Sequence, residues 1–366
     1  MPKIPDSAPE KWVYEQHMRM KHEIFAKYLK PWITVLGRYH GKVVIFDGFA
    51  GRGEYNDGTS GSPVLAMATA QPLIEARYVK EVVCFFIEAN PENHENLAAV
   101  LEEQAPTYPL VHASDPILGT FTDTIEEVLD KFEGNLAPSF FFVDPFGFAG
   151  VPFALLERIL HVPRTEVLLT FMYRDINRFL SAQVVEPTMD SLFGTKKWRD
   201  LLQLDSGVKE MALRDLYIGQ LRSVANYAWP FRVCSDDKAS TLYYLIHATN
   251  SFKGLDIMKG IMYKQGPTSP FAYLGPKDAG TQGQLSLITD DSDDLGELGN
   301  YLGEALAGKT LTYDQIKEQT YQDTNYIDKH YRQALKDLKS AGAVSIRTVS
   351  SKTERGLKGA DEVTFR

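Results

Sequence analysis

The chain has 366 residues, of which 44% are hydrophobic and 24% are charged, and its formal net charge is -9. These values are close to those of soluble globular proteins, so they exclude a disordered, collagenous or coiled-coil chain as a whole. The length allows two or three domains with a core that folds unaided.

Residues 10 to 36 place large apolar side chains at roughly helical spacing among charges, so we expect the fold to open with an amphipathic helix. From there to about residue 265, short runs typical of β-strands alternate with helical stretches. The expected strands are Lys42 to Phe46, Glu81 to Ile87, Leu110 to Ala113, Ser139 to Val143, Glu166 to Phe171, Thr241 to Ala248 and Ile257 to Lys264. This alternation predicts a doubly wound α/β domain.

The remainder of the chain has a different pattern. Residues 266 to 294 are rich in Gly, Pro, Ser, Thr and Asp and have no comparable periodicity, which predicts a linker. The expected elements beyond it are helices at Leu295 to Leu306, Thr312 to Thr320 and Thr324 to Ser340, and strands at Ala343 to Thr348 and Glu362 to Arg366. We therefore predict a helical lead-in at 1–40, a Rossmann-like domain at 41–265, a linker at 266–294 and a winged helix-turn-helix domain at 295–366.

The first predicted strand leads into a glycine-rich turn, Asp47-Gly48-Phe49-Ala50-Gly51-Arg52-Gly53. Glycine has no Cβ and tolerates positive φ, so main-chain N–H groups here can approach a ligand at the carboxyl end of the strand. The predicted cofactor-binding residues of this turn are Asp47, Gly48, Phe49, Ala50, Gly51 and Gly53. A tight strand-to-helix turn also uses glycine without any ligand, so the assignment depends on the motifs that accompany it.

Acidic residues follow the second and third predicted strands. Glu88 closes the strand that starts at Glu81, where a carboxylate can accept both ribose hydroxyls of a nucleoside cofactor; the alternative is that it only caps the next helix. The separation of Gly53 from Glu88 exceeds the roughly 20 residues of the nicotinamide fingerprint, which disfavours a dehydrogenase. Asp115 follows the third strand, where an acid either meets an adenine amino group or caps a helix.

The fourth predicted strand ends in Asp144-Pro145-Phe146-Gly147-Phe148, which resembles the D-P-P-Y motif of amino-methyltransferases. Methyl transfer to an exocyclic amine needs a lone pair that is otherwise delocalised into the base, and acceptors directed at the NH₂ group help to recover it. Asp144 and the Pro145 carbonyl are the candidate acceptors, and Phe146 or Phe148 offers a stacking face. Phe146 replaces the second Pro, so the pattern is nearer to the D-P-F-G of tRNA N2-guanine dimethyltransferases. The structural alternative is an Asp-Pro turn with buried phenylalanines.

These three motifs follow three strands of one predicted sheet, and the carboxyl ends of such strands share one edge, where ligands bind. A seven-stranded, S-adenosylmethionine-dependent methyltransferase accounts for all of them, with Asp144, Pro145 and Phe146 as catalytic residues. The eight histidines are scattered without paired-ligand spacing, so we expect no metal site. Cys84 and Cys234 have no redox or metal spacing and are expected to be buried thiols.

The chain also resembles the three-Cys-motif partner (TcmP) family of predicted methyltransferases over most of its length. The matching segments are Lys21-His22, Tyr28 to Trp32, Asp47 to Gly51 with Gly53 and Tyr55, Gly61-Ser62-Pro63, Val143 to Gly147, Glu166 to Leu169, Phe171-Met172, Ile176 to Phe179, Leu192 to Gly194, Trp198, Leu242 to Leu245 and Ala248-Thr249. The resemblance implies a methyltransferase with a C-terminal winged helix and no settled substrate. It also implies a separate partner chain that carries a three-cysteine motif.

A basic segment stands out against the acidic total. Residues 324 to 358 carry eight Lys or Arg and three Asp or Glu, which leaves the rest of the chain at -14. Such a patch on a winged helix predicts contact with the phosphates of DNA or RNA. The predicted nucleic-acid-binding residues are Lys329, Arg332, Lys336, Lys339, Arg347, Lys352 and Arg355.

We therefore expect a methyltransferase that modifies a base amino group in nucleic acid. Two alternatives stay open at this point: a nucleic-acid-binding regulator whose α/β domain binds a nucleoside without turnover, and a small-molecule methyltransferase. The sequence has no run of about 18 apolar residues and no signal-peptide core at its N-terminus, so we predict a cytoplasmic protein without membrane contact.

Overall fold

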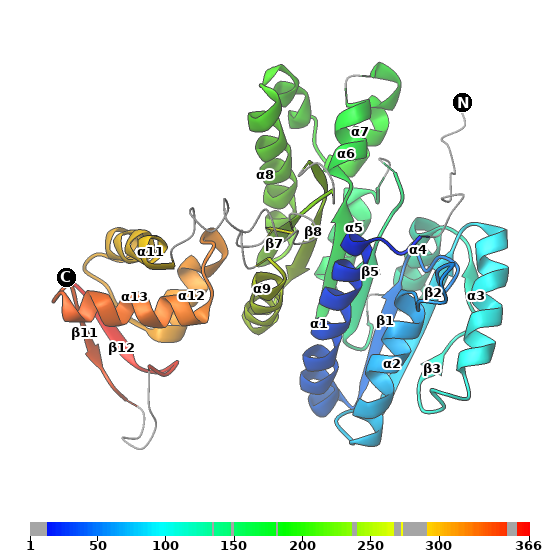
Figure 1. Cartoon of the computed structure of the whole chain (residues 1–366), viewed down its shortest axis with the longest axis horizontal. Helices are drawn as coiled ribbons and strands as arrows, with labels where there is room; N and C mark the ends of the chain where they lie inside the picture. The colour runs from blue at the N-terminus through cyan, green and yellow to red at the C-terminus, as the bar shows by residue number, and fades with distance from the viewer. Residues whose placement is uncertain are drawn as a thin grey trace. The chain divides into compact units, whose positions relative to one another are not determined.

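The computed structural model describes residues 13–133, 135–147, 150–180, 182–235, 240–266, 272–273, 291–349 and 357–366. They form two compact units (Figure 1). The sheet unit comprises the described residues up to Ile261 together with Tyr273, and the C-terminal unit comprises those from Met262 to Ala272 and from 291 onward. Helix α9 (Phe252–Gln265) crosses this division. The predicted linker, residues 266–294, lies largely outside the described residues.

The sheet unit alternates strands and helices. Its strands are β1 (Lys42–Asp47), β2 (Glu81–Glu88), β3 (His112–Ala113), β4 (Ile117–Leu118), β5 (Ser139–Val143), β6 (Thr165–Phe171), β7 (Tyr227–Cys234), β8 (Thr241–Thr249) and β9 (Ala272–Tyr273). Besides α9, its helices are α1 (Gln16–His40), α2 (Ser62–Glu75), α3 (Pro91–Gln104), α4 (Phe121–Lys131), α5 (Phe153–His161), α6 (Tyr173–Phe179), α7 (Glu186–Phe193) and α8 (Ser206–Val224), with 3₁₀ turns at Gln183–Val185 and Lys197–Gln203.

The strand order confirms the predicted fold class. The sheet runs β3-β2-β1-β5-β6-β8-β7-β9, with β4 beside β2. Strands β1, β2, β3, β5 and β6 are parallel, whereas β8 is antiparallel to both β6 and β7. Without the short β4 and β9, this is a seven-stranded sheet in the order 3-2-1-4-5-7-6 with the last strand reversed. That order belongs to the Rossmann-like methyltransferase fold, and it has a switch point between β1 and β5.

Within the sheet unit, one predicted strand is wrong and three strands, β4, β7 and β9, were not predicted. Residues 257–264 are part of α9, where Leu255, Met258 and Met262 are buried at helical spacing, because a short apolar run does not by itself distinguish a strand from a helix. Strand β7 contains Pro230, which argues against a strand in a sequence pattern. In the structure it lies near the edge of the sheet, where the missing N–H is tolerated.

Helices cover both faces of the sheet because successive residues of its strands point to opposite sides. Phe140 and Phe142 of β5 face α1, where Phe142 stacks on Phe25 with ring centroids 4.5 Å apart and Phe140 meets Trp32 with ring centroids 5.5 Å apart. Phe141 packs into the core on the other face, which is formed with buried residues of α4, α5, α7 and α8. Cys84 and Cys234 are buried free thiols, as predicted.

A buried polar cluster joins α1 to the sheet. The Tyr28 hydroxyl donates to Glu166 Oε2 at 2.5 Å, and His247 Nε2 lies 2.8 Å from the same oxygen. All three side chains are buried and come from α1, β6 and β8. Burial and the adjacent Glu166 raise the pKa of Tyr28 well above its ordinary value, so the hydroxyl keeps its proton and remains a donor.

The C-terminal unit has the predicted winged-helix order. It contains α11 (Asp291–Ala305), β10 (Thr310–Thr312), α12 (Tyr313–Thr320), a 3₁₀ turn at Tyr321–Asp323, α13 (Asp328–Ser340), β11 (Val344–Arg347) and β12 (Glu362–Phe365). The strands form an antiparallel sheet in the order β10-β12-β11. Thr312, where the sequence predicts that this helix begins, caps α12 in a capping box with Gln315. Gly342, at a φ of 75°, follows the end of α13.

Within the described residues, none of the helices combines the length and apolar character needed to cross a membrane. Nor do those residues bring together three or more His, Cys, Asp or Glu side chains in an arrangement that could hold a metal ion.

We expect Tyr28→Phe to lower the free energy of unfolding by about 1–3 kcal/mol, because it leaves a buried carboxylate oxygen without one of its donors. Tyr39→Phe is the matched control, since Tyr39 lies on the same helix and is 83% exposed. Urea denaturation of both variants measures the difference. Equal stability of the two variants would show that the cluster does not hold α1 to the sheet.

Candidate functional site

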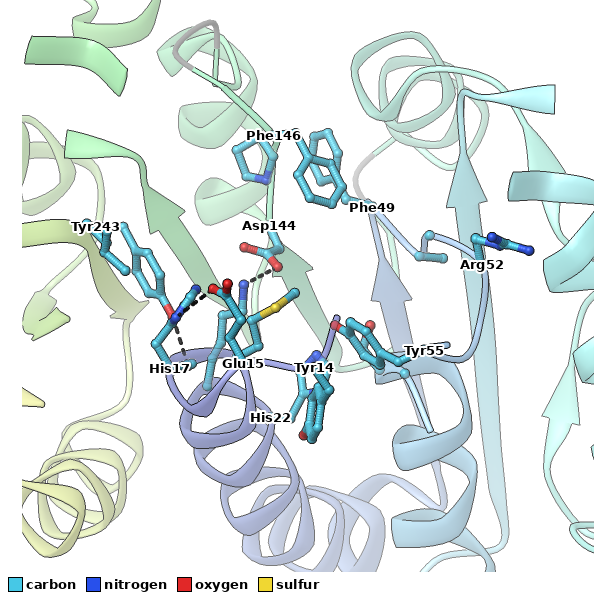
Figure 2. Close-up of a pocket in the computed structure, with 18 of the residues that line it drawn as sticks. Tyr14, Glu15, His17, His22, Phe49, Arg52, Tyr55, Asp144, Phe146 and Tyr243 are labelled. Carbon is cyan, nitrogen blue, oxygen red and sulfur yellow. Dashed lines mark hydrogen bonds and ion pairs between the residues drawn. The ribbon is translucent and has the colours of Figure 1, made fainter. Parts of the chain in front are cut away.

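A cavity of about 610 Å³ lies at the carboxyl ends of β1, β5 and β6 (Figure 2). Its walls come from the start of α1, the glycine-rich turn after β1, the Asp144 segment after β5, the residues after β6 and Tyr243 of β8. The cavity is therefore at the sheet edge where the sequence places the three motifs, next to the β1/β5 switch point.

The glycines of the turn have different tasks. Gly51 and Gly53 adopt positive φ values of 64° and 82°, which favour glycine, and the Gly61 N–H donates to the Gly53 carbonyl at 2.8 Å. Gly48 is required for packing, because a Cβ there would lie 2.3 Å from the Phe121 ring. Phe49, Ala50, Gly51 and Gly53 line the cavity, whereas Gly48 does not.

Glu88 lies behind this turn and braces it. Its Oε2 accepts from the Gly51 N–H and its Oε1 from the Asn90 N–H, both at 2.8 Å. Asn90, whose side chain accepts from the Asn93 N–H, is the N-cap of α3, so Glu88 is not the cap. The Glu88 carboxylate is buried and does not itself line the cavity.

The other two predicted cofactor-binding acids, Asp47 and Asp115, lie in different surroundings. Asp47 is completely buried behind the turn; burial raises its pKa to about 7, and its Oδ2 has no hydrogen-bond partner among the described residues. Asp115 is exposed after β3 and does not line the cavity. It caps no neighbouring helix either, because Thr120 is the N-cap of α4. The structure thus brings Asp47 and Glu88 to the turn and leaves Asp115 apart.

Asp144 forms an ion pair with Lys21 of α1 (Figure 2). The side chains are only 17% and 7% exposed, and both line the cavity. The Lys21 ammonium also lies 5.2 Å from the centroid of the Tyr243 ring. Pro145 is buried and Phe146 is 49% exposed at the cavity, while Phe148 lies outside the described residues.

Lys21 was missing from the predicted site residues. One feature of the sequence could have identified it. Lys21 lies one turn before Phe25 and two turns before Tyr28, on the buried face of α1, where a lysine is rare unless it is paired. Its partner is 123 residues away in the sequence, which periodicity cannot identify.

Aromatic side chains form another part of the wall. Tyr14 and Tyr55 have ring centroids 4.6 Å apart, and the Tyr14 hydroxyl lies 3.3 Å from His22 Nδ1. Burial, together with the neighbouring Lys21 ammonium, lowers the pKa of His22 to about 3, so the ring is neutral. Burial raises the pKa of Tyr55. This wall is therefore uncharged and suited to planar groups.

The predicted nucleic-acid contacts are distributed over the C-terminal unit. Lys329, Arg332, Lys336 and Lys339 are exposed on α13, while Tyr331, Ala334 and Leu335 face the core. Arg332 pairs with Asp328 at 2.6 Å and contacts the Leu357 carbonyl, and Arg347 pairs with Glu362 at 2.5 Å. Lys352 and Arg355 lie outside the described residues. Lys336 and Lys339 therefore present the exposed charge of α13 most directly.

Comparison with known proteins supports the two-part organisation. Residues 275–351 match the family model described as a GMT-like wHTH domain. No curated protein matches the chain.

Several solved structures are similar to the chain at low identity. The DszA carbon methyltransferase is 16% identical with a TM-score of 0.40, over 65% of this chain and 56% of that one. Spermidine synthase from Thermotoga maritima is 9% identical with a TM-score of 0.33, over 72% and 74%. Precorrin-6y C5,15-methyltransferase from Geobacter metallireducens is 13% identical with a TM-score of 0.31, over 67% and 94%. Similarities of this size do not indicate a substrate.

We expect Asp47→Asn to change how the free energy of unfolding depends on pH. The pKa of Asp47 is about 7 in the folded protein against an ordinary value of 3.8, so between these values the folded chain holds a proton that the unfolded chain has released. This stabilisation is fully present below about pH 4 and is lost as the pH rises through about 7. The stability of the variant relative to wild type should therefore increase across this window, as measured by urea denaturation.

Asp115→Asn provides the matched control, since the Asp115 side chain is exposed. Parallel pH profiles for Asp47→Asn and the wild-type protein would contradict a raised pKa at Asp47.

Proposed function

We propose that this chain is an S-adenosylmethionine-dependent methyltransferase that modifies a base amino group in DNA or RNA. The observation that carries the proposal is the cavity at the sheet edge, because the glycine-rich turn and the Asp144-Pro145-Phe146 segment line the same space. A cofactor on the turn and a base against Asp144 would then share one cavity, as direct transfer between them requires.

The residues around the turn fit a nucleoside cofactor. The positive φ values of Gly51 and Gly53 leave the main chain open to close approach at the cavity. Each Glu88 oxygen accepts one main-chain N–H and keeps a further lone pair, so Glu88 stays our candidate acceptor for a ribose hydroxyl. Its carboxylate is buried behind the turn, so a ribose would reach it only through a shift of the Gly51 turn. Asp47 and Gly48 act from behind by shaping the turn. Asp115 is exposed and does not line the cavity, so its contact with an adenine amino group stays a prediction.

S-adenosylmethionine supplies an electrophilic methyl group on a sulfonium sulfur. The amine nitrogen of the base forms the new N–C bond as the S–C bond breaks, and it then loses one proton. Asp144 accepts a hydrogen bond from that amine, aided by the Pro145 carbonyl, which directs the lone pair toward the methyl group. Phe146 and the wall of Tyr14 and Tyr55 offer faces for the base, and the proton leaves through Asp144 to water.

The C-terminal unit would hold the nucleic acid. A winged helix matches residues 275–351, and the exposed lysines of α13 offer contacts to phosphates. Lys329, Arg332, Arg347, Lys352 and Arg355 would add to the same electrostatic attraction. A protein with a three-cysteine motif stays a predicted partner, and the cytoplasm stays the predicted location.

We expect Asp144→Ala to reduce methyl transfer from labelled S-adenosylmethionine by about 100- to 1000-fold, as loss of a preorganised polar contact does. Binding of the cofactor, measured by calorimetry, should be retained. Asp144→Asn keeps an acceptor oxygen and should lose less activity. Glu88→Ala should show the opposite pattern, with weaker cofactor binding first, because the brace of the Gly51 turn is lost.

Asp57→Ala serves as the control, since Asp57 is exposed on the loop after the turn. Full activity of Asp144→Ala would rule out the amine-acceptor mechanism.

Charge reversal at Lys336 and Lys339 should weaken binding of nucleic acid. Each lost phosphate contact should also reduce the salt dependence of the binding constant by about 0.9 in its logarithmic slope. Lys27→Glu with Lys253→Glu makes the same change in net charge on exposed side chains outside α13. Equal losses in both double variants, in fluorescence anisotropy over a salt series, would place the contacts elsewhere.

A further inference from the structure

The cavity presents an ammonium group directly beside the proposed amine acceptor. Lys21 donates one hydrogen bond to Asp144 Oδ2, and both side chains line the cavity. An acceptor alone would suffice to orient an amine. The lysine therefore calls for a second role within the same site.

Stability alone gives little reason for this lysine. The Lys21 side chain is 7% exposed, and removing a charge from water costs free energy that an ion pair recovers only in part. The next neighbours on the same face of α1, Ile24 and Phe25, are apolar and buried, whereas His17, one turn before Lys21, lines the cavity. An apolar residue at position 21 would continue that face, so the charge points to a ligand.

The chemistry of the pair defines what it can recognise. A lysine ammonium has three donors and no acceptor, and an ionised carboxylate has acceptors only. One Lys21 donor serves Asp144, which leaves further donors beside the carboxylate. A donor and an acceptor held side by side match a base edge that carries an acceptor next to an N–H group.

We propose that Lys21 and Asp144 together recognise one edge of the target base, with Asp144 accepting from the exocyclic amine and Lys21 donating to the ring nitrogen beside it. This inference rests on the proposed function and adds how the base is recognised, namely by its amino group together with the accepting ring nitrogen next to it. Adenine, cytosine and guanine offer such an edge. Uracil and hypoxanthine place a carbonyl next to a ring N–H, so the same pair would meet them with the opposite polarity.

The surroundings of the pair are consistent with a planar, uncharged ligand. The adjacent His22 ring is neutral, and Tyr14 and Tyr55 add aromatic faces to the same cavity. Tyr243, 5.2 Å from the Lys21 ammonium, holds the lysine from the side of β8. Lys21 is thus a specificity-determining residue that projects from α1 toward the sheet edge.

The test compares nucleosides that differ by one ring atom. Binding of adenosine, cytidine and guanosine to the full chain is measured by ligand-observed NMR with S-adenosylhomocysteine at saturation, so that the cofactor position is filled. Each is compared with analogues in which CH replaces an accepting ring nitrogen: 1- and 7-deazaadenosine, 3-deazacytidine and 3-deazaguanosine. At least one parent should bind, and an analogue of it should bind about tenfold or more weakly, as loss of a charge-assisted hydrogen bond requires.

Variants at position 21 assign the difference to the lysine. Lys21→Met should bind parent and analogue equally, and Lys21→Arg, which keeps N–H donors, should restore the preference. Lys27→Met on the exposed face of α1 should behave as wild type. Equal binding of parents and analogues to the wild-type protein, a preference that survives in Lys21→Met, or no binding of any parent would each overturn the inference.

Calorimetry with S-adenosylhomocysteine on the same preparation separates this inference from the proposed function. If S-adenosylhomocysteine does not bind, the proposed methyl transfer fails, and the nucleosides are then compared without it. A tenfold preference that depends on Lys21 would still establish recognition of the base edge. If S-adenosylhomocysteine binds but the parent nucleosides bind no more tightly than their analogues, the proposed cofactor stands and only the inference is overturned.

Discussion

Helix α1 is attached to the sheet by a buried carboxylate, and the form of the cavity depends on that attachment. Glu166 of β6 receives the Tyr28 hydroxyl from one side and His247 of β8 from the other. A buried charge of this kind is tolerated only when its neighbours satisfy it, so the three elements must stay in register with one another. Seven residues before Tyr28, two turns along the same helix, Lys21 reaches Asp144. Because Tyr28 and Lys21 lie on one helix, the contacts that hold Tyr28 against β6 and β8 also fix where Lys21 meets Asp144, at the carboxyl end of β5.

The cavity has two halves that are built in different ways. The turn after β1 is shaped from behind by Glu88, whose oxygens both accept main-chain N–H groups, and by Gly48 beneath Phe121. This half is built from backbone and would suit the proposed cofactor, which is the same whatever the substrate. The half around Asp144 is lined by side chains of α1 and β8. Specificity would reside in this second half.

Sequence patterns predicted most of the fold because most of its elements are locally encoded. Six strands of the sheet and the start of α12 near Thr312 follow from apolar runs and from turn chemistry. The pattern failed where local and tertiary preferences disagree. Met258 and Met262 lie in a short apolar run that folds as a helix, and Pro230 lies in a strand.

The candidate site was predictable as a set of loops but not as a set of contacts. Alternating strands and helices predict parallel strands whose carboxyl ends share one edge, so the glycine turn and Asp144 could be placed at that edge in advance. Sequence could not pair Lys21 with Asp144, since that contact depends on how α1 crosses the sheet. Nor could it predict that Asp115 lies exposed, because the third strand, which was expected over Leu110 to Ala113, is only two residues long and is itself exposed.

The position of β8 between β6 and β7 also governs when the cavity can form during synthesis. The partners of Glu166 are 138 residues before it and 81 residues after it, so the attachment of α1 is incomplete until the β7–β8 hairpin has been made and inserted. Contacts between such distant segments form late, because the intervening chain must be ordered first. A nascent chain that ends before β8 lacks Tyr243 as well. Most of the sheet is therefore synthesised before the chain can complete the cavity.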